Sequence, residues 1–314
     1  MQKRSLDHFH HCMTYTVSDG KMTRGATVVL TLLALRPAAT AEEQRVAALV
    51  GCALELLQAA FLVLDDIMDK STIRRGKPCW HLVPSVGLAN AVNDGLFLEN
   101  AVFALVRRCV PVDRRLAVYE LINQTVLRTV VGQNLDVSSI AVADFTADRY
   151  NAIIKSKTAF YSFWLPVALG CVLADASLTE AGDFAKALDV CIALGEYFQV
   201  QDDVLDCYAD AAVLGKKGTD IEEGKCTWLA VEAMKRGSEL ERAEIRRIFS
   251  KGERSEEDVS VVKRLYTALN LPFVFEAFEL DKSAQIDRQL QLIENPGLKH
   301  VLVMLFARIH KRHK

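Results

Sequence analysis

Glycine and proline, which most often interrupt helices, are scarce in this sequence. Its 314 residues include 16 glycines and 7 prolines, whereas the helix formers Ala, Leu, Glu and Arg are abundant in almost every segment. No series of alternating apolar and polar runs indicates strands. The sequence therefore predicts an all-α protein with about ten helices.

Several features of other protein classes are also missing. The eight cysteines form no Cys-x-x-Cys pair and have no His spacing suited to zinc, which favours reduced thiols in an intracellular protein. The net charge is −2, so nothing global indicates nucleic acid or an anionic membrane as a partner. No apolar run is expected to span a membrane.

The termini and the chain organisation give weaker indications. The segment from Met1 to Met22 lacks the apolar core of a secretory signal, and Asp7 counts against a mitochondrial presequence. We expect a cytoplasmic protein, with a mitochondrial or peroxisomal location left open. No Pro-, Gly- or Ser-rich linker interrupts the chain, which favours one domain over residues 1–314.

An apolar helix pattern over residues 41–69 ends in three carboxylates: Asp65, Asp66 and Asp69. Asp65 and Asp69 are four residues apart, so they share a helical face. Two carboxylates on one face repel each other unless a cation lies between them, and oxygen ligands suit magnesium. A solvated acidic helix end explains one such cluster about equally well.

A second copy of this Asp-Asp-x-x-Asp spacing follows the apolar pattern of residues 182–206. It contains Asp202, Asp203 and Asp206, again with the first and last on one helical face. Two such motifs on buried helices can face one another across a bundle cavity. That arrangement would hold magnesium ions for a diphosphate.

Basic residues occur near both motifs. Lys21 and Arg24 lie one helical turn apart, where solvation is the simpler explanation, and Arg74 and Arg75 follow the first motif. Arginine suits bidentate phosphate binding. The charged loop 215–225 contains Lys216 and Lys225 but lacks the spacing of a nucleotide P-loop. An ordinary charged loop and a lid over a phosphate site both fit it.

Lys157 lies in an apolar run, so we expect it to have an anionic partner. Thr158 beside it offers a hydroxyl. The aromatic residues at 160–164 are expected in the core. The basic end of the chain, which includes Arg312, is either disordered or folded over a diphosphate.

Together these residues resemble the eukaryotic farnesyl diphosphate synthase family of trans-isoprenyl diphosphate synthases. The resemblance runs from about Gly20 to Lys314 and is most specific over 58–76, 157–163, 201–206 and 218–225. It implies an isoprenoid-synthase helical bundle around a central cavity, usually as a homodimer. It also implies that a trimagnesium cluster ionises an allylic diphosphate, which isopentenyl diphosphate then attacks.

The resemblance also implies roles for individual residues. Asp65, Asp69 and Asp202 would ligate magnesium, Asp203 and Asp206 would also belong to the metal site, and Asp66 would lie close by. The allylic diphosphate would be held by Arg74, Lys157 and Lys216, and Lys225 would also bind substrate. The isopentenyl diphosphate site would comprise Lys21, Arg24, Gln58 and Arg75, with Arg312 closing it. Thr158 and Gln199 would lie beside the reacting carbons.

The residues before the first acidic motif bear on product length. The resemblance implies bulky side chains at positions 60 and 61 as a floor that stops elongation; here Phe61 is bulky and Ala60 is small. We therefore expect mainly farnesyl diphosphate, with geranylgeranyl diphosphate as an alternative. Equally, Ala60 could simply pack against a neighbouring helix.

The sequence departs from the family pattern at several points. Asp19 replaces a Gly, Thr23 an Asn and Val204 an aromatic residue. Compared with the family, the amino terminus is expected to lack roughly a helical hairpin's worth of chain, either by truncation or by loss of that hairpin. Two alternatives to the synthase are open: a terpene synthase descended from the family and a non-catalytic partner subunit. The retained isopentenyl diphosphate residues and intact acidic motifs favour the synthase.

Overall fold

A computed structural model of the protein describes residues 2–138, 142, 145–175, 182–209 and 218–310. Most of the described residues are helical, which confirms the all-α prediction, and the only sheet among them is a two-stranded hairpin. The chain divides into two compact units. Unit 1 comprises residues 1–124, 165–184 and 295–301; unit 2 comprises residues 125–164, 185–294 and 302–314.

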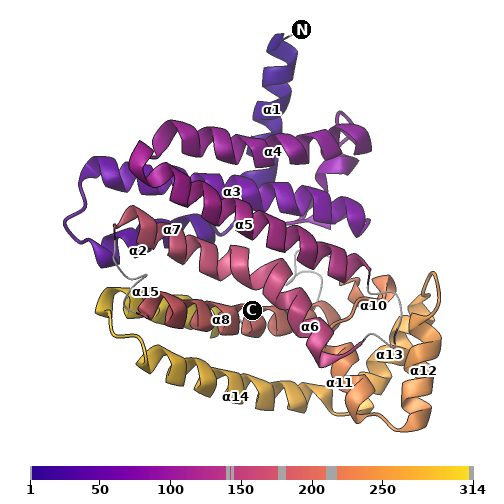
Figure 1. Ribbon diagram of the computed structural model, residues 1–314. Helices are drawn as coiled ribbons and strands as arrows, with labels where there is room; N and C mark the ends of the chain where they lie inside the picture. Colours follow the sequence, from indigo (N-terminus) through magenta and orange to yellow (C-terminus); the bar gives the residue numbers. More distant parts are fainter. Residues whose placement is uncertain (1, 139–141, 143–144, 176–181, 210–217, 311–314) are drawn as a thin grey trace. The chain divides into compact units, whose positions relative to one another are not determined.

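Unit 1 is formed mainly by the first third of the chain (Figure 1). Its elements are α1 (Gln2–Val17), α2 (Thr23–Leu35), α3 (Ala41–Met68), β1 (Ile73–Arg74), β2 (Lys77–Pro78), η1 (Trp80–Leu82), α4 (Gly87–Cys109), the first half of α5 (Val112–Val137) and α7 (Leu165–Leu173).

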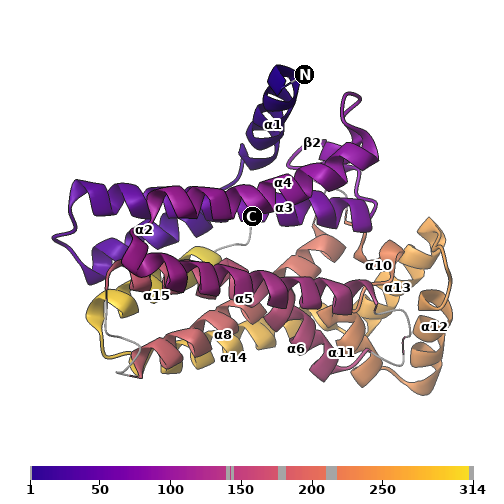
Figure 2. The same cartoon turned by 45° about the horizontal axis from the view of Figure 1, so that its top comes forward.

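The central helix of unit 1 is α3, which lies alongside α4 (Figures 1 and 2) and also packs against α2. It begins with a capping box in which Thr40 and Glu43 satisfy each other's backbone N–H groups. At the α2–α3 crossing, a Cβ on Gly51 would lie 2.6 Å from the carbonyl oxygen of Gly25. Only glycine allows the two backbones to approach so closely.

Helix α3 corrects one expectation from the sequence, because it is long and apolar enough to cross a membrane. Of its most apolar 18-residue stretch, 67% is buried inside the protein. That burial, together with its packing against α2 and α4, is what a core helix requires. No other described helix passes the same test.

Helix α1 was not predicted as a helix from the sequence. It is anchored through the ring of His8, whose Nε2 lies 2.8 Å from Oδ1 of the fully buried Asp94 on α4. The indole of Trp80 donates a hydrogen bond of 2.8 Å to the same carboxylate, and Phe9 stacks on Phe97 at 3.8 Å between ring centroids. These long-range contacts fix α1 within unit 1.

Unit 2 contains the second acidic motif and most of the second half of the chain. Its elements are the rest of α5, α6 (Ala147–Ile154), the π-helical η3 (Lys155–Trp164), α8 (Asp183–Tyr208) from residue 185, α10 (Asp220–Glu223), α11 (Trp228–Arg236), α12 (Glu239–Phe249), α13 (Glu256–Ala268), α14 (Leu271–Gln291) and the end of α15 (Pro296–His310).

One helix boundary in unit 2 lies at Pro272, where a proline in the sequence predicts a break. Helix α13 ends at Ala268 and α14 begins at Leu271, so Pro272 lies in the first turn of α14, where its missing N–H costs no helical hydrogen bond. A boundary that the sequence analysis missed falls at Gly237, where Ser238 caps α12 in a capping box with Glu241. The Ser-x-x-Glu pattern was the available signal.

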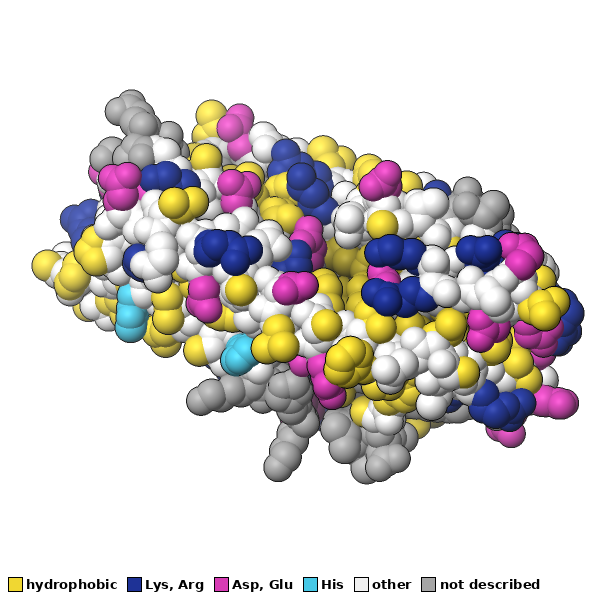
Figure 3. Space-filling view, turned by 90° about the horizontal axis from the view of Figure 1, so that it is seen from below, with side chains coloured by type: hydrophobic (Ala, Val, Ile, Leu, Met, Phe, Trp, Pro, Cys, Tyr) yellow, Lys and Arg dark blue, Asp and Glu magenta, His cyan; other side chains and the backbone are white. Residues whose placement is uncertain are grey.

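Charges of both signs are mixed on the surface. On the face drawn in Figure 3, Lys and Arg side chains are interspersed with Asp, Glu and hydrophobic side chains. This distribution agrees with the net charge of −2. Binding of a strongly charged ligand must therefore depend on local clusters rather than on the field of the whole protein.

Candidate active site

The first acidic motif lies at the carboxyl end of α3, in unit 1. Asp65 and Asp69 are partly exposed, whereas the carboxylate of Asp66 is almost fully buried. Arg74 donates to Asp66 from Nε at 2.9 Å and also from one terminal nitrogen, which lies 3.4 Å from Asp65. Asp66 is thus tied to the hairpin, while the outer two carboxylates remain accessible.

Burial and charge act in opposite directions on the groups around Asp66. Burial lowers the pKa of the Arg74 guanidinium, but the hydrogen bond and the charge of Asp66 outweigh burial and raise it above its ordinary value. Burial, followed by the charge of Asp66, raises the pKa of the Cys79 thiol to about 12. Arg74 therefore stays charged and Cys79 stays protonated at neutral pH.

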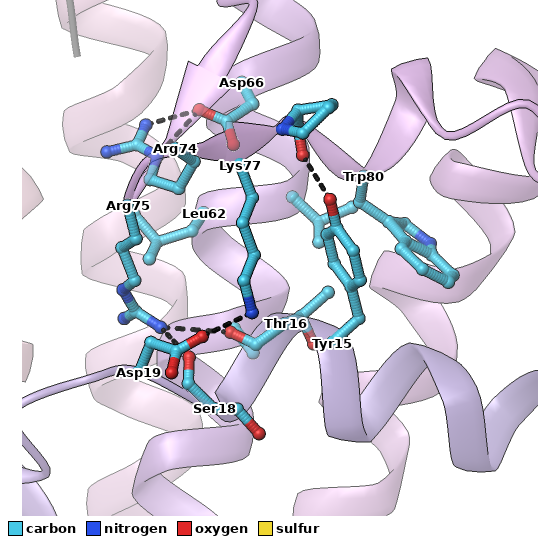
Figure 4. A pocket seen from close by; sticks show the side chains of 13 residues that line it. Tyr15, Thr16, Ser18, Asp19, Leu62, Asp66, Arg74, Arg75, Lys77 and Trp80 are labelled. Carbon is cyan, nitrogen blue, oxygen red and sulfur yellow. Dashed lines mark hydrogen bonds and ion pairs between the residues drawn. The ribbon is translucent and has the colours of Figure 1, made fainter. Parts of the chain in front are cut away.

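A cavity lies beside the first motif, between α1, α3 and the hairpin (Figure 4). Charged, polar and aromatic side chains share its wall with aliphatic side chains of α3. The lining includes Tyr15, Asp19, Leu62, Asp66, Arg74, Arg75, Lys77 and Trp80. Several cations around a small cavity are suited to an anionic ligand.

Arg75 is held by the end of α1. Its NH1 group donates to the carbonyl oxygens of Thr16 at 3.2 Å and Ser18 at 3.0 Å, where the dipole of α1 favours a cation. Burial, followed by the nearby charge of Arg74, lowers the pKa of Arg75; Arg24 acts in the same direction. Arg74 and Arg24 therefore each repel the charge of Arg75, and an anion bound beside Arg75 would offset that repulsion.

The other residues predicted for isopentenyl diphosphate also belong to unit 1. Lys21 is exposed, and Arg24 lies in the first turn of α2. Gln58 is buried on α3, and its Oε1 has no hydrogen-bond partner among the described residues. A buried amide oxygen without a partner is costly, so a ligand or water contact is expected there.

The two predicted chain-length residues have different surroundings. Ala60 is completely buried in a hydrophobic cluster that also contains Cys12, Trp80 and Leu98. Phe61 is partly exposed on the same helix. This placement of Ala60 matches the packing alternative that the sequence left open, and control of product length by either residue stays a prediction.

The second acidic motif lies at the carboxyl end of α8, in unit 2. Its middle carboxylate, Asp203, is buried and accepts hydrogen bonds from Gln199 Nε2 at 3.0 Å, the Tyr150 hydroxyl at 2.6 Å and the Trp228 amide at 2.8 Å. Direct contact with a metal, which the sequence analysis predicted for Asp203, would require breaking these bonds. The fold therefore uses Asp203 to anchor the motif.

Burial decides the ionisation of this anchor. It raises the pKa of Asp203 to about 7, although the three donors oppose the shift. Burial, followed by the charge of Asp203, raises the pKa of Tyr150 well above its ordinary value. The Tyr150 hydroxyl therefore keeps its proton and remains a donor to Asp203.

The other two carboxylates of the second motif face different surroundings. Asp202 is partly exposed. Asp206 is buried and accepts a 3.0 Å hydrogen bond from the backbone amide of Asp220 on α10. Gly218 packs so closely that a Cβ there would lie 1.9 Å from the carbonyl oxygen of Asp206. Because residue 218 is a glycine, its backbone can pack directly against the end of the motif.

The structure describes two of the predicted cations of unit 2. Lys157 has the anionic partner predicted for it, the carboxylate of Asp136 on α5, at 2.6 Å. Lys225 lies 2.9 Å from Glu223. Lys216 and Arg312, both predicted to bind substrate, lie outside the described residues.

Thr158 and Gln199 are linked as a pair in unit 2. The Thr158 hydroxyl donates to Oε1 of Gln199 at 2.9 Å, and the amide of Gln199 donates onward to Asp203. Tyr150, which donates to Asp203, and Asp136, which pairs with Lys157, were not predicted to have a definite role. In the sequence each is a polar side chain within an otherwise apolar pattern, and such residues are too common to identify a site.

The structure thus places the predicted residues in two groups. Asp65, Asp66, Asp69, Arg24, Gln58, Arg74 and Arg75 belong to unit 1, and Lys157, Thr158, Gln199, Asp202, Asp203, Asp206 and Lys225 belong to unit 2. Among described residues, no three His, Cys, Asp or Glu side chains already form a metal site. That the two motifs face one another stays a prediction.

Comparisons with known proteins agree with this chemistry. Residues 7–269 match the family described as polyprenyl synthetase. The chain is 42% identical over 306 residues to a farnesyl pyrophosphate synthase of Nezara viridula, covering 96% of this chain and 74% of that protein. It is 38% identical over 310 residues to one of Gallus gallus, covering 96% and 83%.

Solved structures give the same result. A farnesyl diphosphate synthase of T. brucei complexed with bisphosphonate is similar with a TM-score of 0.94 and 32% sequence identity, covering 100% of this chain and 93% of that one. These relatives support the synthase interpretation over the terpene synthase alternative. The chain therefore belongs to the polyprenyl synthetase family and is a prenyltransferase.

Proposed function

We propose that the protein condenses isopentenyl diphosphate with dimethylallyl or geranyl diphosphate and releases mainly farnesyl diphosphate. The observation that carries this proposal is the cationic cavity of unit 1, where Arg74 and Arg75 lie beside the first acidic motif. This cavity would serve as a second diphosphate site, which only an enzyme that elongates its substrate needs. A terpene synthase, which uses one prenyl diphosphate, has no need of it.

Magnesium is the cofactor that these residues fit. The donors are carboxylates, and Asp65 and Asp69 are partly exposed four residues apart on one helix, as is Asp202 in its own motif. Hard oxygen ligands with open positions for phosphate oxygens suit Mg²⁺. When bound, magnesium would stabilise the negative charge that develops on the departing diphosphate.

The chain's own residues have distinct tasks in this proposal. Arg74 and Lys157, both held by carboxylates in the structure, add positive charge for the allylic diphosphate. Arg75, Arg24 and Gln58 hold isopentenyl diphosphate so that its double bond can attack the allylic carbon. Thr158 and Gln199, whose polar atoms are already bonded to each other, border the reacting carbons.

Product identification tests the proposal. The purified chain is incubated with Mg²⁺, isopentenyl diphosphate and either dimethylallyl or geranyl diphosphate, and products are analysed by mass spectrometry. Farnesyl diphosphate is expected from both allylic substrates, and geranylgeranyl diphosphate would show that Ala60 permits a longer product. Volatile hydrocarbons or alcohols without elongation would contradict the proposal.

We further propose a homodimer that uses an apolar stripe on α4. Leu88, Val92 and Leu96, spaced four residues apart, are 58%, 42% and 53% exposed. Such a stripe usually marks a protein–protein contact. Light scattering after size exclusion should give twice the 34.9 kDa chain mass, and Leu96→Glu should shift it toward the monomer. An unchanged mass in that variant would place the contact elsewhere.

A further inference from the structure

An ion pair lies at the edge of the cationic cavity in unit 1. Nζ of Lys77 on β2 is 2.5 Å from Oδ2 of Asp19, in the loop after α1 (Figure 4). Both residues line the cavity together with Arg74 and Arg75. The resemblance implies no role for Lys77, and Asp19 stands where the family has a glycine.

The hairpin explains why Lys77 lines the same cavity as the predicted phosphate ligand Arg74, although Arg74 ends at Asp66 and Lys77 at Asp19. These two residues are directly opposite each other in the antiparallel pairing of β1 and β2. Directly opposed residues project from the same face of a sheet. The intervening Arg75 and Gly76 have φ angles of 53° and 74°, the left-handed conformation that a tight two-residue hairpin turn requires.

Asp19 places a carboxylate among these cations. In Figure 4 the ends of Arg75 and Lys77 converge on it. The hydrogen bond from Lys77, then its charge, hold the pKa of Asp19 below its usual range, and Arg75 acts in the same direction. Asp19 is therefore ionised at neutral pH and gives the cavity an anion of its own.

We propose that Lys77 is an additional ligand for the diphosphate of isopentenyl diphosphate, and that Asp19 is the counter-ion which Lys77 exchanges for that diphosphate. The proposal rests on the function proposed above. A lysine with a flexible stem can move from a carboxylate to a phosphate oxygen without changing the backbone. Asp19 then competes with the substrate and weakens its binding.

Two possible roles of Asp19 predict opposite effects of removing its charge. In one, Asp19 gives up Lys77 to the diphosphate; in the other, it only ties the loop to the hairpin. Both residues are about half exposed, with side-chain exposures of 52% for Asp19 and 48% for Lys77, so the pair itself adds little stability. If Asp19 only ties the loop to the hairpin, its loss loosens the cavity and weakens binding. If Asp19 competes with substrate, its loss strengthens binding.

Steady-state kinetics with isopentenyl diphosphate as the varied substrate separate these outcomes. Asp19→Asn keeps the size of the side chain and tolerates the φ of 66° at this position; it should lower KM about two- to fivefold. Lys77→Gln should raise KM about three- to tenfold, whereas Lys77→Arg, which keeps the charge, should stay within about twofold of the wild type.

The matched control is Arg45→Gln, which breaks an exposed ion pair with Glu42 on α3 and should leave KM unchanged. Calorimetric titration with inorganic diphosphate should reproduce the order of affinities without turnover. An unchanged KM in Lys77→Gln, or a raised KM in Asp19→Asn, would overturn the proposal. Either result obtained while farnesyl diphosphate is still formed leaves the proposed function intact, so the two failures are distinguishable.

Discussion

The two acidic motifs share one spacing but hold their middle carboxylate in different ways. Asp66 in unit 1 is paired with a cation, the guanidinium of Arg74. Among the described residues, the hydrogen-bond donors to Asp203 in unit 2 are all neutral: Gln199, Tyr150 and the amide of Trp228. Helix geometry explains the common part, because the middle residue is turned about 100° from the face shared by the outer two.

The contrast supports a division of tasks within each motif. The middle carboxylate fixes the end of the helix to its own unit, whereas Asp65, Asp69 and Asp202 are partly exposed, as the proposed metal ligands must be. The electrostatic surroundings differ, since Asp66 lies beside the guanidinium of Arg74, whereas burial raises the pKa of Asp203 although its three donors oppose the shift. The motifs should therefore respond differently to mutation and to pH.

The largest expected effect is on activity, when an outer carboxylate is removed. Asp65→Ala or Asp202→Ala should lower kcat by at least about 100-fold, because the lost interaction acts on charge that develops in the transition state. The free energy of unfolding should stay close to that of the wild type. The exposed Asp287→Ala serves as a control. Near wild-type turnover in either variant would show that the mutated carboxylate does not bind the metal.

The next effect is on stability. Asp66→Ala should lower the free energy of unfolding by about 3 kcal/mol, because it leaves the largely buried Arg74 without its main partner. Urea unfolding measures this loss, with Asp65→Ala as the matched variant in the same motif. A loss no larger than that of Asp65→Ala would show that the Asp66–Arg74 pair is not an anchor.

The third prediction concerns pH. Asp203 has a folded pKa of about 7, above the ordinary value of 3.8, so the folded state binds the proton more tightly. Stability from this group is fully present below about pH 4 and is lost as pH rises to about 7. Between pH 5 and 7 this amounts to about 2 kcal/mol. Asp203→Asn, which mimics the protonated form, should show a correspondingly smaller loss.

Urea unfolding at several pH values without added metal measures this difference, with Asp202→Asn as the control. If Asp203 is already ionised between pH 5 and 7, the wild type and Asp203→Asn should lose stability in parallel. Such a parallel loss would contradict the neutral-donor account of the second motif.

The smallest expected effect is on product length near the first motif. Phe61→Ala should lengthen the product, and Ala60→Phe should shorten it. Because Ala60 is fully buried in a packed cluster, the larger side chain should also cost about 1–3 kcal/mol of stability. Mass spectrometry of the products and urea unfolding measure the two effects. An unchanged product distribution in both variants would locate the floor elsewhere.

Much of this architecture was predictable because its signals are local. Apolar periodicity predicted the long helices, and a lysine in an apolar run predicted an acidic partner, which is Asp136. The His8–Asp94 contact that docks α1 joins residues 86 positions apart, and no local pattern indicates it. Likewise, spacing showed that Asp203 lies off the outer face but not that Tyr150 and Trp228 hold it.

The most direct test of the division between outer and middle carboxylates is the Mg²⁺ concentration that gives half-maximal condensation rate. Asp202→Asn and Asp203→Asn are adjacent and isosteric, and each replaces a carboxyl group with an amide, so they form a matched pair. We expect a rise of at least about tenfold for Asp202→Asn and a value within about twofold of the wild type for Asp203→Asn. Equal rises in both variants would contradict this division.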